Sequence, residues 1–358
     1  MHHALQRRDI ELVNLGFPRY PNTLHSQIEK KLRSAVSLFQ SPAASIFTES
    51  TRYKNFDARV EKQLRDAPCD AVIAPVASSE LNFLETNVPI VYVTDATPRL
   101  IYDYYHIPET PAEFAIYEQR EVIALLKSKL LIYSSNWAAN SAMTSYNAPK
   151  NKVKVIPFGA NIESAPTLKE IEAKFKPSRW RLLFVGVSWE RKGGIIAYET
   201  LLSLLERGVD AELTIMGCTP PAEIQHERLT VIPFLNKNNP GDRDRFNQMF
   251  LQSHFLVFPT RADCSPIATC EANAFGLPVI ASNTGGLPTI IKNGKNGYSL
   301  PLEARGQEYA DAIAQQITDD RTYENLVLSS RHEYDTRLNW DAWATSIQQA
   351  ISEMLDSL

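Results

Sequence analysis

The chain has 358 residues, more than one hydrophobic core usually supports, so two domains are expected. Hydrophobic residues make up 44% of it and charged residues 22%, which is the composition of a soluble globular protein. The formal net charge of -4 argues against a nucleic-acid-binding protein, since such proteins are normally basic.

Charge is distributed unevenly along the chain. Residues 1–65 contain 11 Lys and Arg against 6 Asp and Glu, a local charge of +5, so the remaining residues carry -9. Such a basic segment can lie against an anionic acceptor or an acidic membrane surface, or it can be a set of solvated helix faces. A peripheral membrane contact therefore stays open beside the solvated alternative.

Cysteine and histidine spacing indicates no metal site. The four cysteines form no CxxC pair and no disulfide framework, which fits a reducing compartment, and the histidines lack metal-binding spacing. No apolar run approaches the roughly 18 residues of a membrane span, and no signal-peptide pattern opens the chain. We therefore expect a cytoplasmic protein, with a peripheral position at the inner membrane face as the second expectation.

Short apolar runs alternate with longer amphipathic stretches, which predicts parallel sheets wrapped by helices. Residues 1–8 read as a helix that no strand and glycine-rich turn precede. Either the fold begins atypically, or the natural chain starts further upstream. The strands expected in the first half are Ile10–Leu15, Ala71–Pro75, Ile90–Val93, Lys129–Tyr133 and Val153–Pro157.

The pattern restarts after a charged link at Leu168–Lys176. One open sheet of all the strands would be unusually wide, so we expect two sheets of about five strands joined near residue 165. Residues 340–358 have helical periodicity and end the chain. The strands expected after the link are Arg181–Val187, Ala211–Met216, Leu229–Pro233, His254–Pro259, Pro278–Ala281 and Gly297–Leu300.

The segment Leu182–Gly194 is a candidate phosphate site. It reads LLFVGVSWERKGG: an apolar strand runs into Gly186, and Arg191 and Lys192 precede a helix expected near Ile195. Free amides, the helix dipole and cationic side chains all favour an anion there, whereas the alternative is a tight turn with two solvated cations. The Walker loop and GxGxxG patterns are absent, so the ATP and NAD fingerprints both fail.

The stretch from Ala262 to Gly286 combines two carboxylates with a helix start. Asp263 lies in a polar loop, a helix begins about Pro266 with Ser265 as its cap, and Glu271 follows eight residues after Asp263. Ligands of open α/β sheets bind outside the carboxyl ends of strands, where these loops meet. Amides after Ser265 can hold a diphosphate, Glu271 can accept from both hydroxyls of a ribose, and Asp263 can accept from a sugar.

This arrangement resembles the retaining glycosyltransferases of family 4. The resemblance rests on an acid, seven residues, a Glu, then Ala-x-Ala-x-Gly-Leu-Pro-Val-Ile-Ala and Thr-Gly-Gly, and on a junction-like Pro157-Phe-Gly-Ala-Asn161. It implies an α/β fold of the GT-B type, with two Rossmann-like doubly wound parallel-sheet domains facing a cleft. Here the amino-terminal domain lacks its first strand. The implied domains are an acceptor-side domain at 1–163, a nucleotide-sugar-binding domain at 164–338, and a helix at 339–358 that packs back on the first domain.

The resemblance implies a retaining, metal-independent glycosyltransferase. A sugar would move from a nucleotide-sugar donor to a hydroxyl of a glycan, lipid-linked or small-molecule acceptor, with no cofactor and no nucleic-acid partner. The implied catalytic residues are Asp95, Lys192 and Asp263. The implied donor-binding residues are Gly186, Arg191, Lys192, Asp263, Ser265, Pro266, Ile267, Glu271, Thr284 and Gly285.

Four positions depart from the family's pattern. Asp263 stands where the family mostly has Glu, and Thr289 replaces the Glu of a GGxPE motif. Val187 stands where many members have an arginine that grips the diphosphate, a role that Arg191 would then take. Asp95 stands where many members have a histidine near the reacting sugar, and it can equally be the cap of the following helix.

Two other hypotheses compete with a transferase. A nucleotide-sugar epimerase of the same fold needs paired acids and histidines facing the cleft, and the sequence offers no identifiable set. An inactive or truncated relative would bind a nucleotide-sugar without transferring it.

Overall fold

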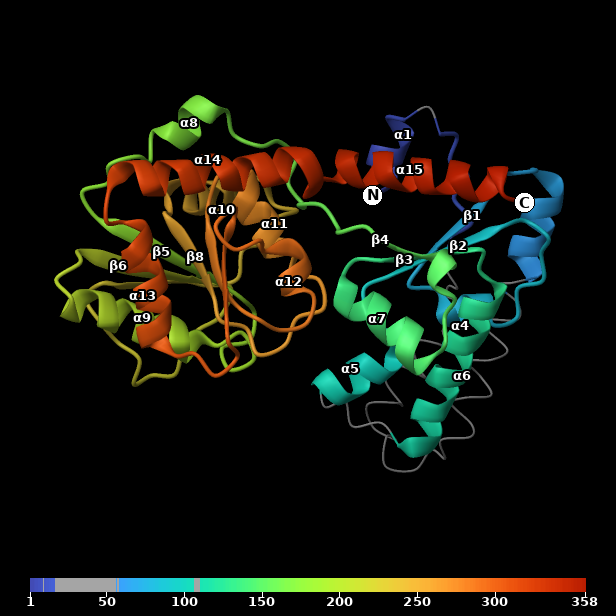
Figure 1. The fold of residues 1–358 in the computed structure, drawn as a ribbon, viewed down its shortest axis with the longest axis horizontal. Coiled ribbons are helices and arrows are strands. Elements are labelled where there is room, and N and C mark those ends of the chain that lie inside the picture. Colours follow the sequence, from blue (N-terminus) through green and yellow to red (C-terminus); the bar gives the residue numbers. More distant parts are fainter. Residues whose placement is uncertain (9, 17–55, 57, 106–109) are drawn as a thin grey trace. The chain divides into compact units, whose positions relative to one another are not determined.

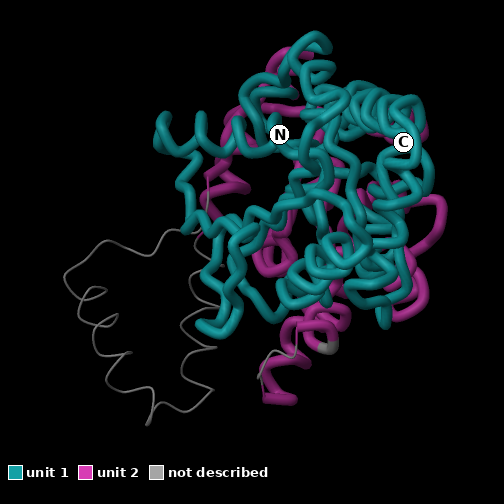
Figure 2. The backbone as a smooth tube through the Cα atoms, turned by 90° about the vertical axis from the view of Figure 1, so that its left-hand side faces the viewer, with its two compact units in different colours: residues 1–4, 134–138, 156–347 teal, residues 5–133, 139–155, 348–358 magenta. Residues whose placement is uncertain are grey.

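The computed structural model describes residues 1–8, 10–16, 56, 58–105 and 110–358. These residues form two compact units, which Figure 2 colours separately, and each unit contains one parallel sheet (Figure 1). No helix within the described part is long and apolar enough to cross a membrane. Unit 1 comprises residues 1–4, 134–138 and 156–347, and unit 2 comprises the described residues of 5–133, 139–155 and 348–358.

Unit 2 is built on a four-stranded parallel sheet in the order β1-β2-β3-β4. All residues of β2 and β3 are buried, as expected for parallel strands that are covered on both faces. Four of the five strands expected in the first half are thus confirmed, with ends that differ by one or two residues. The strands are β1 (Val72–Pro75), β2 (Ile90–Thr94), β3 (Leu130–Tyr133) and β4 (Val153–Val155).

Among the described residues, residues 58–66 are helical in addition to the six helices named below, and all of these precede or separate the strands. The longest, α6, begins with a capping box in which the Thr110 side chain accepts from the Glu113 amide and the Glu113 carboxylate accepts from the Thr110 amide. The first helix confirms the helix expected at the start of the chain. The helices are α1 (His2–Gln6), α4 (Ser78–Leu81), α5 (Pro98–Tyr105), α6 (Pro111–Lys127), α7 (Asn136–Ser145) and the short 3₁₀ helix η1 (Lys150–Lys152).

The strand expected at Ile10–Leu15 is wrong. Residues 10–16 carry no strand, and none of their side chains is buried; Val13 is 55% exposed. A parallel strand needs burial of its apolar side chains on both faces, and Glu11 and Asn14 interrupt the apolar pattern of this segment.

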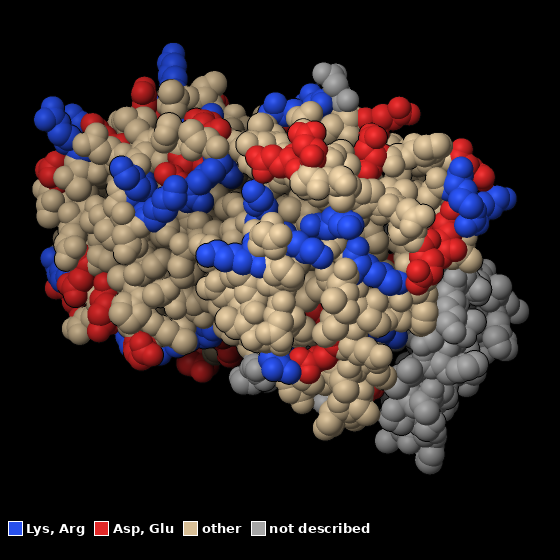
Figure 3. Space-filling model, turned by 45° about the vertical axis from the view of Figure 1, so that its right-hand side comes forward, with Lys and Arg blue, Asp and Glu red and all other residues tan. Residues whose placement is uncertain are grey.

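The expectation about the basic segment 1–65 falls largely on residues 17–55, outside the described residues. Figure 3 shows both basic and acidic side chains of the described residues on the face that it draws.

Unit 1 contains a six-stranded parallel sheet in the order β10-β9-β8-β5-β6-β7. The six strands expected in the second half are all confirmed, again with small differences at their ends. They are β5 (Trp180–Val185), β6 (Ala211–Met216), β7 (Leu229–Ile232), β8 (Phe255–Phe258), β9 (Val279–Ser282) and β10 (Gly297–Leu300).

The connections of unit 1 run in two directions from a central pair of strands. The first strand, β5, pairs with β6 on one side and with β8 on the other, so β5–β7 and β8–β10 extend in opposite directions. The boundary between β5 and β8 is therefore a topological switch point, where ligands of such sheets bind outside the carboxyl ends of the strands.

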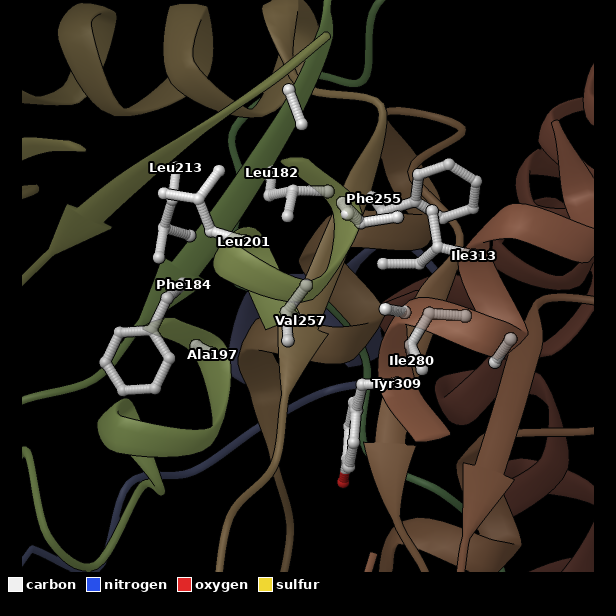
Figure 4. Packing of buried hydrophobic residues seen from close by; sticks show 14 of the residues in the cluster. Leu182, Phe184, Ala197, Leu201, Leu213, Phe255, Val257, Ile280, Tyr309 and Ile313 are labelled. Atoms are coloured by element: carbon white, nitrogen blue, oxygen red, sulfur yellow. The ribbon is translucent and has the colours of Figure 1, made fainter. Parts of the chain in front are cut away.

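Both faces of the unit 1 sheet are covered by apolar cores. Leu182 and Phe184 of β5 point into one core and Leu183 points into the other, as the two-residue period of a strand requires. Figure 4 shows the first core, where Leu182 and Phe255 lie near Leu201 and Ile313 of the covering helices.

Helices connect most strands of the second half, except that β7 follows β6 without a helix, and three helices follow β10. Gly276, in the left-handed region with φ 60°, lies one residue beyond the C-cap Phe275 of α11 and confirms the predicted end of that helix. The residues from 348 onward in the terminal helix belong to unit 2, where Glu353 pairs with Lys154 of β4 at 3.2 Å. The helices are α8 (Leu168–Glu172), α9 (Gly194–Glu206), α10 (Pro240–Gln252), α11 (Ile267–Ala274), α12 (Leu287–Ile290), α13 (Gly306–Gln316), α14 (Asp320–Arg337) and α15 (Trp340–Asp356).

Candidate functional site

Two loops flank the switch point of unit 1. The β5 loop (residues 186–193) follows β5, and the β8 loop (residues 259–266) follows β8. Arg191 joins them, since its guanidinium donates to the Ala262 carbonyl at 2.9 Å and its own carbonyl accepts from the Arg261 amide at 2.8 Å. The two motifs that the sequence singled out therefore form one structural feature.

Glycines allow these loops to approach closely. A Cβ at Gly186 would lie 2.6 Å from Cγ of Lys192, so the lysine stem crosses a place that only glycine leaves free. Gly193 has φ 75°, and a Cβ there would lie 2.1 Å from the carbonyl oxygen of Pro259. The absence of a side chain at both glycines thus allows the Lys192 side chain to pass over Gly186 and the β5 loop to lie against Pro259.

The amides of the β5 loop differ from the expectation. The amides of Lys192, Gly193 and Gly194 donate within the turn, to the carbonyls of Ser188, Glu190 and Trp189 at 3.0, 3.0 and 2.8 Å. A tight turn of this kind uses its own donors, because buried backbone groups need partners. An anion at this loop would therefore be held mainly by side-chain cations.

Lys192 and Asp263 form an ion pair at the switch point. Nζ of Lys192 donates to Oδ2 of Asp263, and each side chain is 12% exposed. Burial lowers the pKa of Lys192, and the Asp263 carboxylate opposes that effect. Nζ also lies 4.9 Å from the ring centre of Phe258. A phosphate that enters here competes with Asp263 for the same ammonium group.

Glu271 is buried and accepts from a lysine that the sequence prediction missed. Its side chain is 4% exposed, and its Oε1 lies 2.5 Å from Nζ of Lys237. Burial raises the pKa of Glu271, whereas Lys237 and a backbone hydrogen bond from Asn161 lower it. The carboxylate projects from α11, whose start lies in the β8 loop, so it belongs to the same edge of the sheet.

The start of α11 corrects one expectation. Its cap residue is Pro266 and makes no side-chain cap bond, so Ser265 is not the cap. Pro266 has no amide proton, and the Ile267 amide donates to the Ser265 carbonyl at 2.8 Å. The helix therefore begins one residue later than expected. The amide predicted to be free at Ile267 has a partner in this structure.

The Thr-Gly-Gly turn lies beside the β8 loop. The Gly286 amide donates to the Asp263 carbonyl at 3.1 Å, and a Cβ on Gly286 would lie 1.9 Å from the carbonyl oxygen of Cys264. Gly285 adopts φ 54°, and half-buried Thr284 begins the turn. The motif thus positions the backbone of Asp263, and direct ligand contacts of Thr284 and Gly285 stay predictions.

Asp95 is in the other unit. It is half-buried and follows β2 directly, three residues before α5 begins at Pro98. The other predicted site residues all belong to unit 1. Its catalytic role and its alternative role as a helix cap both stay predictions.

A sequence signal for Lys237 existed. The residue follows β7 at the same carboxyl edge of the parallel sheet, and a cation near such an edge is a candidate partner for a buried carboxylate. Asn161 lies in the junction motif that the sequence did single out, but its backbone bond to Glu271 depends on tertiary structure.

Comparisons with known proteins bear on the same part of the chain. The family model described as "Glycosyl transferases group 1" matches residues 179–319. A D-inositol 3-phosphate glycosyltransferase of Corynebacterium diphtheriae is 23% identical over 248 residues, which cover 63% of this chain and 57% of the relative. Spore coat protein SA of Bacillus subtilis is 27% identical over 183 residues, which cover 46% of this chain and 47% of the relative. The chain thus spans roughly half the length of these curated relatives.

Solved structures share the fold of both units. A sucrose-phosphate synthase of Thermosynechococcus elongatus superposes with a TM-score of 0.63 at 17% identity, covering 86% of this chain and 79% of that chain. Anabaena HepE in complex with UDP superposes with a TM-score of 0.59 at 18% identity, covering 85% of this chain and 82% of that chain. With two parallel-sheet α/β units, the GT-B fold that the sequence predicted is confirmed.

Proposed function

Since residues 179–319 form a group 1 glycosyl transferase domain in a chain of GT-B fold, we propose that the protein transfers a sugar from a nucleotide-sugar donor to an acceptor hydroxyl. One observation carries the proposal. The Lys192–Asp263 pair and the buried Glu271 both lie in connections that leave the carboxyl edge of one parallel sheet, beside its switch point. A nucleoside diphosphate sugar carries a ribose diol, a diphosphate and sugar hydroxyls, which match Glu271, Lys192 and Asp263 in turn.

The roles follow from the chemistry of each side chain. Glu271 accepts from the two ribose hydroxyls, because an ionised carboxylate offers several acceptor positions. Lys192 serves the diphosphate as a compact charge, and Arg191 has further guanidinium donors beside its bond to Ala262. Asp263 then accepts from hydroxyls of the donor sugar. The UDP complex of HepE makes a uridine diphosphate donor the first to test.

The proposed reaction exchanges one bond at the anomeric carbon. The bond from that carbon to the diphosphate oxygen breaks, and the electron pair leaves with the diphosphate. The acceptor oxygen forms the new bond on the same face, which retains the configuration, and its proton passes to the departing diphosphate. Lys192 and Arg191 stabilise the charge that develops on the leaving group, and electrostatic stabilisation of this kind usually contributes most to the rate acceleration.

We propose that the reaction needs no metal ion, because these two cationic side chains can supply the charge that a divalent cation would supply. Asp95 would orient a sugar hydroxyl or assist the proton transfer. The acceptor is a hydroxyl of a glycan, of a lipid-linked sugar or of a small molecule.

Titration calorimetry with UDP, after a thermal-shift screen of UDP-, GDP- and ADP-sugars, tests the donor site. Glu271→Ala is expected to weaken binding at least about tenfold, since a hydrogen bond to a charged group contributes roughly 1.5–3 kcal/mol. The matched control is Glu172→Ala, which removes an exposed carboxylate of α8 and should leave affinity unchanged. Equal affinity of wild type and Glu271→Ala would refute the ribose assignment.

Turnover separates the proposal from its alternative. Donor hydrolysis or transfer to a sugar acceptor is expected alongside binding. Binding without any turnover would instead support a nucleotide-sugar-binding protein that does not transfer.

A further inference from the structure

We propose that Lys237 is a positioning residue of the donor site, which holds Glu271 as an oriented, ionised acceptor for the ribose diol. This inference rests on the proposed function and deepens it. Neither the sequence motifs nor the family resemblance singles out this lysine. It lies 34 residues before Glu271 and belongs to a different connection, between β7 and α10.

The ammonium group of Lys237 is fixed from three directions. Nζ donates to Oε1 of Glu271 at 2.5 Å and to the carbonyl of Asn161 at 3.2 Å, and it lies 4.7 Å from the ring centre of Phe246. A cation–π contact and a carbonyl both favour the charged form of a lysine. Three contacts therefore hold the Lys237 ammonium group beside the Glu271 carboxylate.

The turn that carries Lys237 is itself closed. The Asn239 amide donates to the Asn236 carbonyl at 2.8 Å, and the Asn236 amide donates to the Asp242 carboxylate at 3.0 Å in the first turn of α10. The Asn239 side chain caps the same helix. Because the turn is tied to α10 at both ends, the backbone of Lys237 is placed before any ligand arrives.

Burial makes a countercharge necessary for Glu271. Its side chain is 4% exposed whereas that of Lys237 is 35% exposed, so the carboxylate is the group that has lost its water. A buried carboxyl without a partner takes up a proton, and a protonated carboxyl loses acceptor capacity for hydroxyl donors. Lys237 and the Asn161 amide are the groups that lower the pKa of Glu271 against burial.

The other titratable groups near this carboxylate do not replace Lys237. Cys270, the preceding residue on α11, is fully buried, and burial raises the pKa of its thiol to about 12. The charge of Arg337, from α14, acts on that thiol. Among the described residues, Lys237 is thus the cation that bonds to Glu271.

The two hydrogen bonds to the Glu271 carboxylate leave acceptor positions for the two hydroxyls of a diol. An ionised carboxylate offers about four lone-pair positions. Lys237 occupies one and the Asn161 amide occupies another, so about two remain, which is what two vicinal ribose hydroxyls require. Lys237 thus aims Glu271 without using up its acceptor capacity.

Proton linkage on UDP binding tests the inference. In Lys237→Met, Glu271 loses its countercharge and its pKa rises, so ligand binding must first remove a proton. The UDP affinity of the wild type between about pH 6.5 and 9 supplies the reference profile, which includes any titration of Lys192 because that residue is the same in the variant. The variant should lose up to about tenfold for each pH unit below the raised pKa and recover as the pH rises. Calorimetry in buffers of different ionisation enthalpy should show more proton release by the variant than by the wild type.

Three further variants serve as controls. Lys237→Arg keeps a cation and should keep the wild-type pH profile. Lys169→Met removes an exposed lysine of α8 and should match the wild type. In Glu271→Gln the ionisable group is gone, so adding Lys237→Met should introduce no pH dependence. Thermal melting confirms that each variant is folded.

The UDP-binding results distinguish a failure of the Lys237 role from a failure of the proposed donor site. If the wild type and Lys237→Met bind UDP with the same affinity and pH profile, the positioning role is refuted and the donor site stands. A uniform loss of affinity with the wild-type pH profile, shared by Lys237→Arg, would mean that Lys237 only supports the fold or touches the ligand itself, which also overturns the inference. If the wild type binds no nucleotide, both proposals fall.

Discussion

The buried carboxyl of Glu121 in unit 2 predicts a stability that falls as the pH rises. The side chain projects from α6 and is 1% exposed, and Tyr92 of β2 donates to its Oε2 at 2.9 Å. Burial raises the pKa of Glu121 from 4.5 to about 7, and the hydroxyls of Tyr92 and Ser78 lower it by less. The folded state therefore holds the carboxyl neutral under conditions where the unfolded chain ionises it.

Proton linkage gives the direction and the size of this pH dependence of stability. A carboxyl whose pKa is raised by folding stabilises the folded state fully below pH 4.5, and this contribution is lost as the pH rises through about 7. Each pKa unit corresponds to about 1.4 kcal/mol, so the loss between about pH 5 and 8 is roughly 2–3 kcal/mol. Glu121→Gln, which is neutral at every pH, should remove that slope and should be the more stable protein at pH 8.

Hydrogen exchange of the β2 and β3 amides is the assay, because it reports the unfolding free energy of unit 2 by itself. The control is Glu118→Gln, one turn earlier on α6. The Glu118 carboxylate pairs with Arg99 at 2.9 Å, so its loss should not increase stability at high pH. Parallel pH profiles for the wild type and Glu121→Gln, after correction for intrinsic exchange rates, would refute the reasoning.

Three further outcomes are expected in unit 1. Lys192→Ala should lower donor hydrolysis or transfer by about 10²–10³-fold while uridine affinity changes little, and unaffected turnover would exclude the phosphate role. Gly286→Ala places a Cβ 1.9 Å from the Cys264 carbonyl, so it should cost about 1–3 kcal/mol of stability and weaken UDP binding. In Gly241→Ala the new Cβ makes an ordinary contact at 3.5 Å, so this control should lose neither stability nor UDP affinity. Equal melting temperatures of the wild type and Gly286→Ala would contradict the clash. Excess EDTA should leave turnover intact, whereas a loss that Mg²⁺ restores would contradict the metal-free mechanism.

Strands that pass through the cores could be predicted from the sequence because their signal is local. Leu182 and Leu183 of β5 are both apolar and enter opposite cores, so residues 182–185 are apolar at every position. The rule that parallel strands end at one edge then predicts that the loops after β5 and β8 lie together. The Ile10–Leu15 segment is interrupted by Glu11 and Asn14 and is not buried, so its apolar residues alone were not enough to predict a strand.

Hydrogen-bond partners could not be predicted in the same way. The backbone angles around Pro266 decide which carbonyl the Ile267 amide reaches. They also decide whether Ser265 or Pro266 caps α11, a difference of one residue that the sequence pattern does not resolve. The Lys237–Glu271 bond joins two connections through the packing of α10 and α11, and no spacing in the chain encodes it. The residue types of the site could therefore be named, but not the pairs they form.

Those pairs change how the donor site is understood. The sequence suggested two carboxylates and two cations awaiting a ligand, whereas the structure pairs Asp263 with Lys192 and Glu271 with Lys237. The two pairs differ in what a nucleotide-sugar would do to them. A diphosphate attracts Lys192 away from Asp263, which frees Asp263 to accept from sugar hydroxyls at the moment the phosphates are held. Ribose hydroxyls carry no charge and cannot displace Lys237, so Glu271 keeps its countercharge through binding. One pair thus exchanges partners during the proposed reaction, and the other stays fixed.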